Sequence, residues 1–306
     1  MPATLHFFIG KGGVGKSTTS ALTALRLAQS GRRALLVSLD PAHNQRDIFM
    51  QPLSEKPMSI CANLMVKEID VDQWAQAYLK KSIDLLKKAY AYQSALNIQR
   101  YFNILKFSPG LEEHALLLAF DDTLARDRAL DDILFDTPLT ALTLRFFSLP
   151  VITRLWLKEL IALRTKIYAK KAIVSKIKWK SIEIEQDKVK NRLQSLIADS
   201  QRQSACFTSG ATRINLVLNS DPLSCSEAVR ICRKLNDIEM NVTRVILNKC
   251  PPGETSENFD PVLGAYPIWR FPISKTGLTG LRALERYLQG HPGAVAVHDT
   301  LAAWTT

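Results

Sequence analysis

Residues 10–17 read Gly-Lys-Gly-Gly-Val-Gly-Lys-Ser and match the pattern G-x-x-x-x-G-K-[ST] in full. The apolar residues 5–9 before this stretch predict a short buried strand, and residues 16–30 after it have the apolar spacing of a helix that ends before Gly31. Glycines between a strand and a helix let consecutive backbone N–H groups approach an anion closely, and the helix N-terminus adds partial positive charge. The stretch therefore predicts a phosphate-binding loop, and a glycine-rich turn without a ligand is the alternative.

The elements that follow this loop predict the fold. Residues 34–39 form a second apolar run, so the order strand, turn, helix, strand predicts a parallel βαβ unit. The remaining expectations are strands at 133–135, 214–218 and 244–247, helices at 223–235 and 278–288, and a proline-rich loop at 251–272. Together they predict an α/β fold of the P-loop NTPase type, with a doubly wound, mostly parallel sheet. We expect one such domain over residues 1–306, with mainly helical insertions at about 71–107 and 151–204.

The composition excludes several classes of protein. The chain has 306 residues, of which 46% are hydrophobic and 23% charged, as in globular rather than disordered proteins. No uncharged apolar run approaches the roughly 18 residues that a membrane-spanning helix needs. The first residues lack the features of a secretory signal, and the five cysteines are widely spread, which favours a reducing compartment. We therefore expect a cytoplasmic protein.

Positive charge is concentrated in one part of the chain. The net charge is +11, and residues 151–180 contain nine lysines and arginines against one acid, Glu159. The same stretch has apolar residues at helical spacing, such as Ile152, Trp156 and Leu160, and it also contains Trp179. An apolar and basic helix suits an acidic membrane surface or a partner helix with acidic flanks, and the alternative is that its stripe packs on its own domain. Nucleic acid is not expected as a partner, because the stretch is too apolar for a simple track of phosphate contacts.

The phosphate-binding loop predicts a site for a nucleoside triphosphate and Mg²⁺. Lys16 is expected to neutralise the β- and γ-phosphate oxygens, and the Ser17 hydroxyl to bind Mg²⁺. A carboxylate at the end of a strand adjacent to the loop's own strand would supply a second anchor for Mg²⁺ or position a water molecule. Asp40 and Asp136 follow predicted strands and are the candidates, and capping of the following turn is the alternative for each. The predicted nucleotide-binding residues of the loop are Gly10, Gly12, Gly13, Val14, Gly15, Lys16, Ser17 and Thr18.

The residues after the predicted strand 244–247 indicate the base. Asn248 and Lys249 begin the pattern N-K-x-D, which reads guanine in GTPases, but Pro251 stands in place of the aspartate that accepts from guanine. Adenine is therefore favoured, and the side-chain amide of Asn248 is the group that we expect to contact it. An ordinary loop asparagine is the alternative.

These motifs resemble a known family. Lys11 adds a second lysine and gives K-G-G-V-G-K-S-T, the deviant Walker A form of the dimeric ATPases that include MinD, ParA and nitrogenase iron protein. Residues 38–44 resemble the D-P-A-H switch I segment of the ArsA family, and residues 135–150 resemble its D-T-A-P-T-G-H-T-L-R switch II. Residues 108–113 resemble its P-G-x-[DE]-E loop. The chain is thus similar to the ArsA-type ATPases, which comprise the arsenite-pump ATPase and the ATPases that target tail-anchored proteins.

The resemblance implies roles for individual residues. A homodimer would close around two ATP molecules with Mg²⁺, and Lys11 would reach across to the nucleotide of the other subunit. Asp40 would orient the attacking water, and Asp136 would hold the Mg²⁺ shell. Adenine would be flanked by Asn248, Pro272 and Ile273. Hydrolysis would open the dimer, and the helical insertions would carry the change to a client protein or a membrane-associated partner.

The chain also departs from the family pattern. Four positions of switch II differ, so slow hydrolysis or a different sensing of the γ-phosphate is expected. They are Pro138, Leu139, Ala141 and Leu142, where the family has A, P, G and H. The C-x-x-C pair that binds zinc in the targeting dimers is missing, so no zinc is predicted. Cys225 and Cys232 lie seven residues apart on one predicted helix face and are interpreted as small buried thiols rather than as a metalloid-binding pair.

The leading hypothesis from the sequence is therefore a Mg-ATP-dependent dimeric ATPase switch. Two alternatives stay open at this point: a nucleotide-gated binding module with little turnover, and the soluble ATPase subunit of a metalloid pump. The altered switch II favours the first alternative. Targeting or chaperone work is favoured over metalloid transport, because no thiol cluster is evident.

Overall fold

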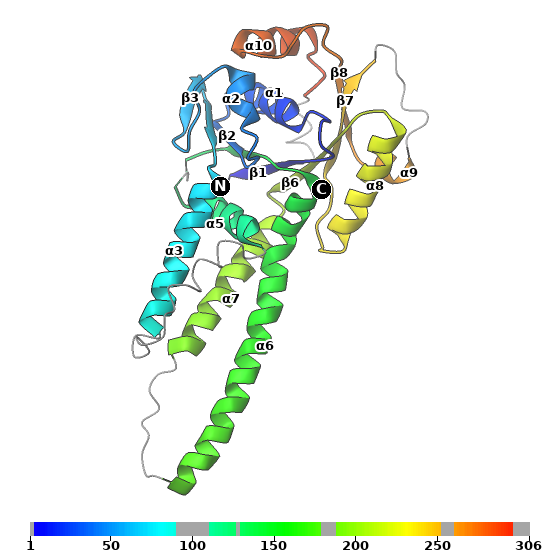
Figure 1. The fold of residues 1–306 in the computed structure, drawn as a ribbon. Helices are drawn as coiled ribbons and strands as arrows, with labels where there is room; N and C mark the ends of the chain where they lie inside the picture. The colour runs from blue at the N-terminus through cyan, green and yellow to red at the C-terminus, as the bar shows by residue number, and fades with distance from the viewer. Residues whose placement is uncertain (1–2, 90–109, 127–128, 179–187, 252–259, 296–306) are drawn as a thin grey trace. The chain divides into compact units, whose positions relative to one another are not determined.

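The computed structural model describes residues 3–89, 110–126, 129–178, 188–251 and 260–295 (Figure 1). Part of the predicted 108–113 loop (Ser108 and Pro109), Trp179, and the 71–107 insertion beyond residue 89 lie outside the described residues. The chain divides into two compact units, Met1–Arg145 with Gly210–Thr306, and Phe146–Ser209. The expectation of a single domain over 1–306 with two insertions stays a prediction.

The larger unit is built on a sheet of eight described strands in the order β3-β4-β2-β5-β1-β6-β7-β8. The strands are β1 (Thr4–Ile9), β2 (Ala34–Ser38), β3 (Met58–Cys61), β4 (Leu64–Glu68), β5 (Asp132–Asp136), β6 (Thr212–Leu218), β7 (Arg244–Cys250) and β8 (Ile268–Pro272). Neighbouring strands run parallel, except that β3 and β4 are antiparallel. The α/β fold with a doubly wound, mostly parallel sheet is therefore confirmed.

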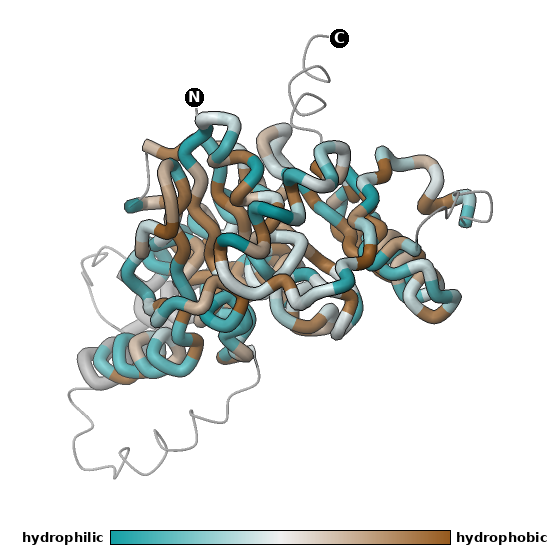
Figure 2. Tube along the Cα trace, turned by 90° about the horizontal axis from the view of Figure 1, so that it is seen from above, coloured by the Kyte–Doolittle hydropathy of each residue, from teal (hydrophilic) through white to brown (hydrophobic). Residues whose placement is uncertain are grey.

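The core of the larger unit lies on both faces of the sheet. β1 is buried along nearly its whole length, and Phe7 stacks on Phe135 of β5 with ring centroids 4.9 Å apart. Helices cover both faces of such a strand, which is why Phe7, Phe8 and Ile9 of β1 are all buried and do not alternate with exposed polar residues. Figure 2 shows the strands mostly as brown, apolar segments and the outer turns of the helices largely in teal.

The strand order corrects one expectation about Asp40. β1 pairs with β5 and β6, whereas β2 pairs with β5 and β4, so the strand before Asp40 is not adjacent to the strand before the phosphate-binding loop. The first two strands are parallel, as predicted, but the helix that connects them crosses over far enough for β5 to lie between them. Asp136, in contrast, ends the strand directly beside β1.

The helices of the larger unit are α1 (Lys16–Gln29), α2 (Asn44–Phe49), α3 (Val71–Ala89), α5 (Leu111–Arg126), α8 (Pro222–Asn236), α9 (Pro261–Gly264) and α10 (Leu281–Gly290). α1 ends where the sequence predicts, because Gly31 has φ 87°, a left-handed conformation that glycine adopts without strain. Of the others, α2, α5 and α9 were not predicted, and neither were β3, β4 and β8.

The proline-rich stretch 251–272 is not the simple loop expected from its sequence. Pro261 opens α9, whose N-cap Asp260 accepts a hydrogen bond from the Val262 N–H, and Pro272 is the last residue of β8. Proline is tolerated at the first turn of a helix and at the edge of a sheet, because its missing N–H is not needed there. Pro261 and Pro272 are therefore terminal residues of these elements and do not interrupt them.

The smaller unit consists of helices within its described residues. α6 (Thr140–Lys178) begins in the larger unit and continues into the smaller one, which also contains α7 (Lys188–Phe207). Phe146, Phe147 and Phe207 form an aromatic cluster with ring centroids 5.1 to 5.2 Å apart. α6 starts earlier than the predicted helix and includes Pro150, which was expected to precede it. No helix in the described part of the chain is long and apolar enough to cross a membrane.

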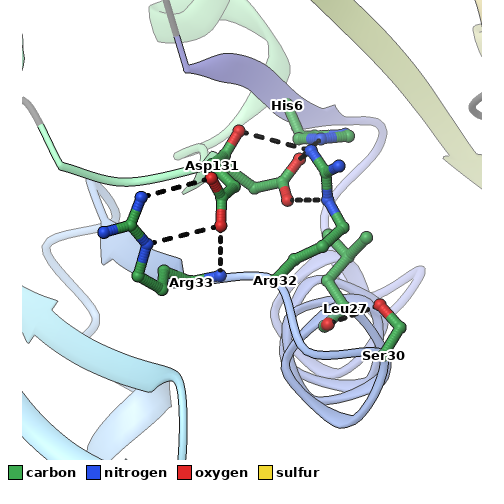
Figure 3. A network of polar contacts seen from close by, with 7 residues as sticks. His6, Leu27, Ser30, Arg32, Arg33 and Asp131 are labelled. Atoms are coloured by element: carbon green, nitrogen blue, oxygen red, sulfur yellow. Dashed lines mark hydrogen bonds and ion pairs between the residues drawn. The ribbon is translucent and has the colours of Figure 1, made fainter. Parts of the chain in front are cut away.

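A network of charged side chains joins the strand ends opposite the phosphate-binding loop (Figure 3). Asp132 at the start of β5 accepts from the His6 Nε2 at 3.0 Å and from the Arg32 Nη2 at 2.9 Å, and the neighbouring Asp131 accepts from the Arg33 backbone N–H at 2.8 Å. Burial lowers the pKa of His6 and works against ionisation of Asp132, but hydrogen bonds from His6 and Arg32 still lower the pKa of Asp132. The network fastens the turn after α1 to the beginnings of β1 and β5.

Candidate functional site

The loop at residues 10–17 follows β1 and leads into α1, as the motif requires. Gly13 and Gly15 have φ values of 81° and 93°. A Cβ at Gly10 would lie 2.1 Å from the Val217 carbonyl oxygen, and one at Gly15 would lie 2.2 Å from the Asn248 Nδ2. Larger residues at these positions would clash or strain the backbone, so the glycines are explained by the shape of the loop.

The side chain of Lys16 lies inside the loop. It is buried, and its Nζ donates to the carbonyl oxygens of Gly10 at 3.2 Å and Lys11 at 3.4 Å. Burial lowers the pKa of Lys16, while the carboxylates of Asp136 and Asp40 act in the opposite direction. The lysine therefore presents a partly desolvated positive charge at the point where the loop opens.

A cavity of about 820 Å³ opens beside this loop, within the larger unit. This size lies within the usual range for small-molecule sites. The predicted residues that line it are Gly12, Gly13, Gly15, Lys16, Ser17, Thr18, Asp40, Asn248, Pro272 and Ile273. The predicted residues Gly10, Lys11, Val14 and Asp136 are not part of its lining, and Gly10, Val14 and Asp136 are buried behind it. Thus most of the predicted residues come together around one cavity.

Asp136 is completely buried next to the start of α1. Its Oδ2 accepts from the Gln45 Nε2 at 2.9 Å, and its Oδ1 has no hydrogen-bond partner among the described residues. Burial raises the pKa of Asp136 to about 6, although hydrogen bonds from Ser17 and Gln45 and the charge of Lys16 lower it. A buried carboxylate with an unpaired oxygen calls for a positive ligand.

The donor atoms at this point suit Mg²⁺. Ser17 supplies a hydroxyl and Asp136 a carboxylate, and hard cations of this kind prefer oxygen ligands. The described residues contain no group of three or more His, Cys, Asp or Glu that could hold a metal ion by themselves. A Mg²⁺ ion here would therefore share its shell between these two side chains and the oxygens of a bound phosphate, which is its usual mode in phosphate sites.

Asp40 has a structural contact as well as a place in the cavity. Its Oδ1 accepts from the Ala42 N–H at 3.0 Å, and its own carbonyl accepts from the His43 N–H at 3.1 Å. The side chain thus caps the turn after β2, which was the alternative considered for it, and it also lines the cavity. The two properties are compatible, because a carboxylate has several acceptor positions.

The dipeptide Asn248-Lys249 is bound to the phosphate-binding loop. The Asn248 Nδ2 donates to the Val14 carbonyl at 2.7 Å, and the Lys249 Nζ donates to the Gly13 carbonyl at 3.2 Å. Pro272 and Ile273 line the same cavity, and the Pro272 carbonyl accepts from the Tyr287 hydroxyl at 2.7 Å. An adenine contact by Asn248 stays a prediction, but its side chain lies at the cavity where the contact would be made.

The altered switch II segment runs from the end of β5 through residues 137–139 into the start of α6. Thr137 donates to the Phe8 carbonyl at 2.6 Å, and Thr140 donates to the Gly10 carbonyl at 3.0 Å, so two hydroxyls bind this segment to β1 and the loop. Leu139 is 63% exposed and lines the cavity. Sequence reasoning missed the contacts of these threonines and of Gln45, because hydrogen bonds between distant segments leave no local pattern in a sequence.

This loop follows a central strand of a mostly parallel sheet, Lys16 and Ser17 begin the next helix, and Asp136 ends the adjacent strand β5. Together these features define a P-loop NTPase. The family described as anion-transporting ATPase, ArsA ATPase, matches residues 3–263, and the chain belongs to this family. The resemblance inferred from the motifs is thereby confirmed.

Individual relatives agree with this membership. The chain is 28% identical over 257 residues to "Putative arsenical pump-driving ATPase 2" of Aquifex aeolicus, an alignment that covers 83% of each protein. It is 28% identical over 253 residues to "ATPase ASNA1 homolog" of Entamoeba histolytica, with 80% of this chain and 76% of the relative covered. It is 37% identical over 148 residues to "Arsenical pump-driving ATPase" of Escherichia coli, with 47% of this chain and 25% of that protein covered. The relatives are thus named as ATPases of two kinds, arsenical pump-driving and ASNA1-like.

Proposed function

We propose that the protein is a Mg-ATP-dependent ATPase that works as a dimeric switch of the ArsA type. The observation that carries the proposal is the phosphate-binding loop of residues 10–17, which opens onto a cavity of about 820 Å³ with a buried lysine and an unpaired buried carboxylate oxygen beside it. The names of the relatives support ATP as the nucleotide. Hydrolysis would break the bond between the β- and γ-phosphates.

Each residue of the site has a proposed part in this reaction. Backbone N–H groups of the loop and the Lys16 ammonium bind the phosphates and stabilise the charge that develops on their oxygens. Ser17 and Asp136 hold Mg²⁺, which when bound neutralises the β- and γ-phosphate oxygens. Asp40 orients the attacking water, and Asn248 with the turn 272–273 receives adenine.

The proposed dimer follows from the family and from Lys11. This lysine is half-buried on the loop but is not part of the cavity lining. In a dimer that closes over the nucleotide, its ammonium would act on the phosphates bound by the other subunit, as an arginine finger does. Location in the cytoplasm is proposed on the same family grounds.

The output of the switch is proposed to pass through the helical segments. α6 begins at the cavity and continues to residue 178. Its exposed apolar residues lie three or four positions apart, so they share one helix face: Ile152, Leu155, Trp156, Leu160 and Leu163. Basic residues between them, such as Lys158, suit a client helix or a membrane surface with acidic groups.

Two alternatives keep specific support. Ala141 and Leu142 stand where the family has glycine and histidine in switch II, and this alteration favours a nucleotide-gated binding module with little turnover. The names of several relatives favour an ATPase subunit of a metalloid pump. Burial raises the pKa of the Cys232 thiol to about 11, so it stays protonated at neutral pH, and this argues against a metalloid-binding pair with Cys225.

Phosphate release distinguishes these possibilities. We expect the wild-type protein to hydrolyse Mg-ATP, and Asp40→Asn to keep nucleotide affinity while losing at least about 10²-fold in rate. Lys16→Ala should lose nucleotide binding, and Asp237→Asn, an exposed carboxylate at the end of α8, should behave as wild type. Equal and near-background rates for wild type and Asp40→Asn would support the binding module instead. A pull-down with Asp40→Asn would then identify the client held by the closed form.

A further inference from the structure

The short helix α2 follows the turn at Asp40 and is held from two sides. On the inner side the wholly buried side chain of Gln45 lies against the start of α1. Its Nε2 lies 3.0 Å from the Ser17 carbonyl, 3.2 Å from the Ser20 Oγ and 2.9 Å from the Asp136 Oδ2. One amide therefore contacts both residues that are proposed to hold Mg²⁺.

On the outer side α2 is anchored to the end of β4. The buried Glu68 carboxylate accepts from the Arg46 backbone N–H at 2.8 Å and from the Arg46 Nε at 3.3 Å, and the His43 Nδ1 lies 3.5 Å from its Oε2. The backbone of β4 is in turn bound to β2, where the Ile69 N–H donates to the Ser38 carbonyl at 3.0 Å. Through Glu68, the outer side of α2 is therefore fixed to the sheet.

The Gln45 amide is costly as a purely structural group. Its Oε1 is buried and has no hydrogen-bond partner among the described residues, and a buried acceptor without a partner destabilises a folded protein. An aliphatic side chain of the same size would fill the space without that cost. The hydrogen bond to Asp136 is thus the feature that distinguishes glutamine from an apolar residue at this position.

We propose that Gln45 is a positioning residue that couples the segment 40–50, which carries Asp40, to occupation of the cation site. The inference rests on the proposed function, because it needs Mg²⁺ at Ser17 and Asp136. The Gln45 amide responds to a rearrangement of the Asp136 carboxylate or of the Ser17 backbone, since it is hydrogen-bonded to that carboxylate and to the Ser17 carbonyl. Glu68 holds the other side of α2 in place. A movement of the Gln45 side chain therefore changes the conformation of the turn between Asp40 and Gln45.

Such a coupling works in both directions. If Mg²⁺ binding stabilises one arrangement of segment 40–50, that arrangement strengthens Mg²⁺ binding by the same factor. The turn has a residue suited to such a role in His43, whose φ of 52° is a left-handed conformation that costs a non-glycine residue energy. The coupling lets Asp40 take its working position only when the cation is in place.

Hydrogen exchange of the peptide covering residues 40–50 tests this coupling directly. The protein is saturated with a non-hydrolysable ATP analogue, and amide exchange is followed by mass spectrometry with and without Mg²⁺. In the wild type we expect Mg²⁺ to slow exchange of this peptide by about tenfold. In Gln45→Met, which keeps the length of the side chain but removes the amide, we expect a change of less than about twofold, although the analogue still binds.

The control variant is Ser20→Ala. It removes one acceptor of the same amide and leaves the contact with Asp136, so it should keep the wild-type response to Mg²⁺. Gln45→Leu is a second variant in case Gln45→Met does not fold. An equal response to Mg²⁺ in the wild type and in the folded Gln45 variant overturns the inference and leaves the proposed function intact. Failure of the wild type to bind the analogue overturns the proposed function itself.

Discussion

The side-chain amide of Asn248 donates to the backbone carbonyl of Val14 at 2.7 Å, and this bond ties the end of β7 to the phosphate-binding loop. The same Nδ2 occupies the space that a Cβ at Gly15 would need, at 2.2 Å. The conformation of the loop therefore depends on Asn248 as well as on the loop's own glycines. A residue that was predicted for base recognition thus also supports the phosphate site.

Replacement of Asn248 should weaken nucleotide binding even before any base contact is considered. In Asn248→Ala the Val14 carbonyl loses its donor, and we expect the free energy of unfolding to fall by about 1–2 kcal/mol. We also expect the dissociation constant for ATP to rise by about tenfold, because the loop is less well ordered. Chemical unfolding and nucleotide titration measure the two effects. Asn236→Ala, on the exposed end of α8, should change neither, and wild-type values for Asn248→Ala would contradict the support role.

Gly10 should not tolerate a methyl group. In Gly10→Ala the new Cβ would meet the Val217 carbonyl oxygen at 2.1 Å, so β1 and β6 or the loop itself must shift. We expect a loss of about 1–3 kcal/mol in the free energy of unfolding, together with loss of ATP binding. Thermal unfolding and nucleotide titration are the measurements. Gly290→Ala has no heavy atom within 4 Å of its new Cβ and is the matched control; equal stability of the two variants would show that the strands can separate without cost.

Removal of the Asp136 charge should stabilise the metal-free protein. Burial raises the pKa of Asp136 to about 6 from 3.8, so the folded protein binds this proton more tightly than the unfolded chain does. The stability that the protonated carboxyl gives the folded state is complete below pH 3.8 and is lost as the pH rises through about 6. At pH 7.5, Asp136→Asn should therefore raise the free energy of unfolding by up to about 3 kcal/mol, and the gain should shrink toward pH 4. Urea unfolding in a chelator at both pH values tests this. The variant should also lose the effect of Mg²⁺ on nucleotide affinity, and a lower stability at pH 7.5 would contradict the prediction.

His6 should make the protein less stable in mild acid. Burial lowers the pKa of His6 below the value of about 6.5 that a histidine has in the unfolded chain. The stability that the neutral His6 contributes is therefore present above pH 6.5 and is lost as the pH falls through the lowered pKa. His6→Gln keeps an N–H donor for Asp132 but cannot titrate. We expect the free energy of unfolding of the wild type to fall more steeply below pH 6.5 than that of His6→Gln. If the free energy of unfolding fell equally steeply with pH in both proteins, protonation of His6 would not destabilise the folded state, and the prediction would be wrong.

The sequence allowed the central part of the fold to be predicted, because the signals there are local. β1, the loop 10–17 and α1 follow from an apolar run, a glycine pattern and helical spacing, and the structure has them at nearly the same residues. β3 was missed because it has only four residues at the edge of the sheet, and β4 because its apolar residues 64–66 are followed by the charged Lys67 and Glu68. β8 was missed because Pro267 precedes it and Pro272 is its last residue, and closely spaced prolines are typical of a loop. The strand order could not be derived, because it depends on pairings between distant segments.

In the candidate site, too, residues with a local sequence signal were predicted and residues placed by distant contacts were not. The residues of the loop and Asp136 were identified from a motif and from their place after a strand. Gln45 and Thr140 were not identified, because nothing near them in the sequence indicates that they reach Asp136 and Gly10. Their contacts arise only when β5 lies beside β1, so they follow from the topology and not from a pattern.

Lys11 gives the last prediction, which concerns the proposed dimer. If its ammonium acts on the nucleotide of the other subunit, Lys11→Ala should bind Mg-ATP as the wild type does but release phosphate about 10²- to 10³-fold more slowly, because the charge matters only in the transition state. Sedimentation should show a wild-type dimer with a non-hydrolysable ATP analogue. Lys56→Ala, an exposed lysine outside the cavity, is the control and should keep the wild-type rate. A wild type that stays monomeric under saturating analogue would remove the role across subunits, whereas a Lys11→Ala variant that loses ATP binding would place this lysine in its own subunit's site.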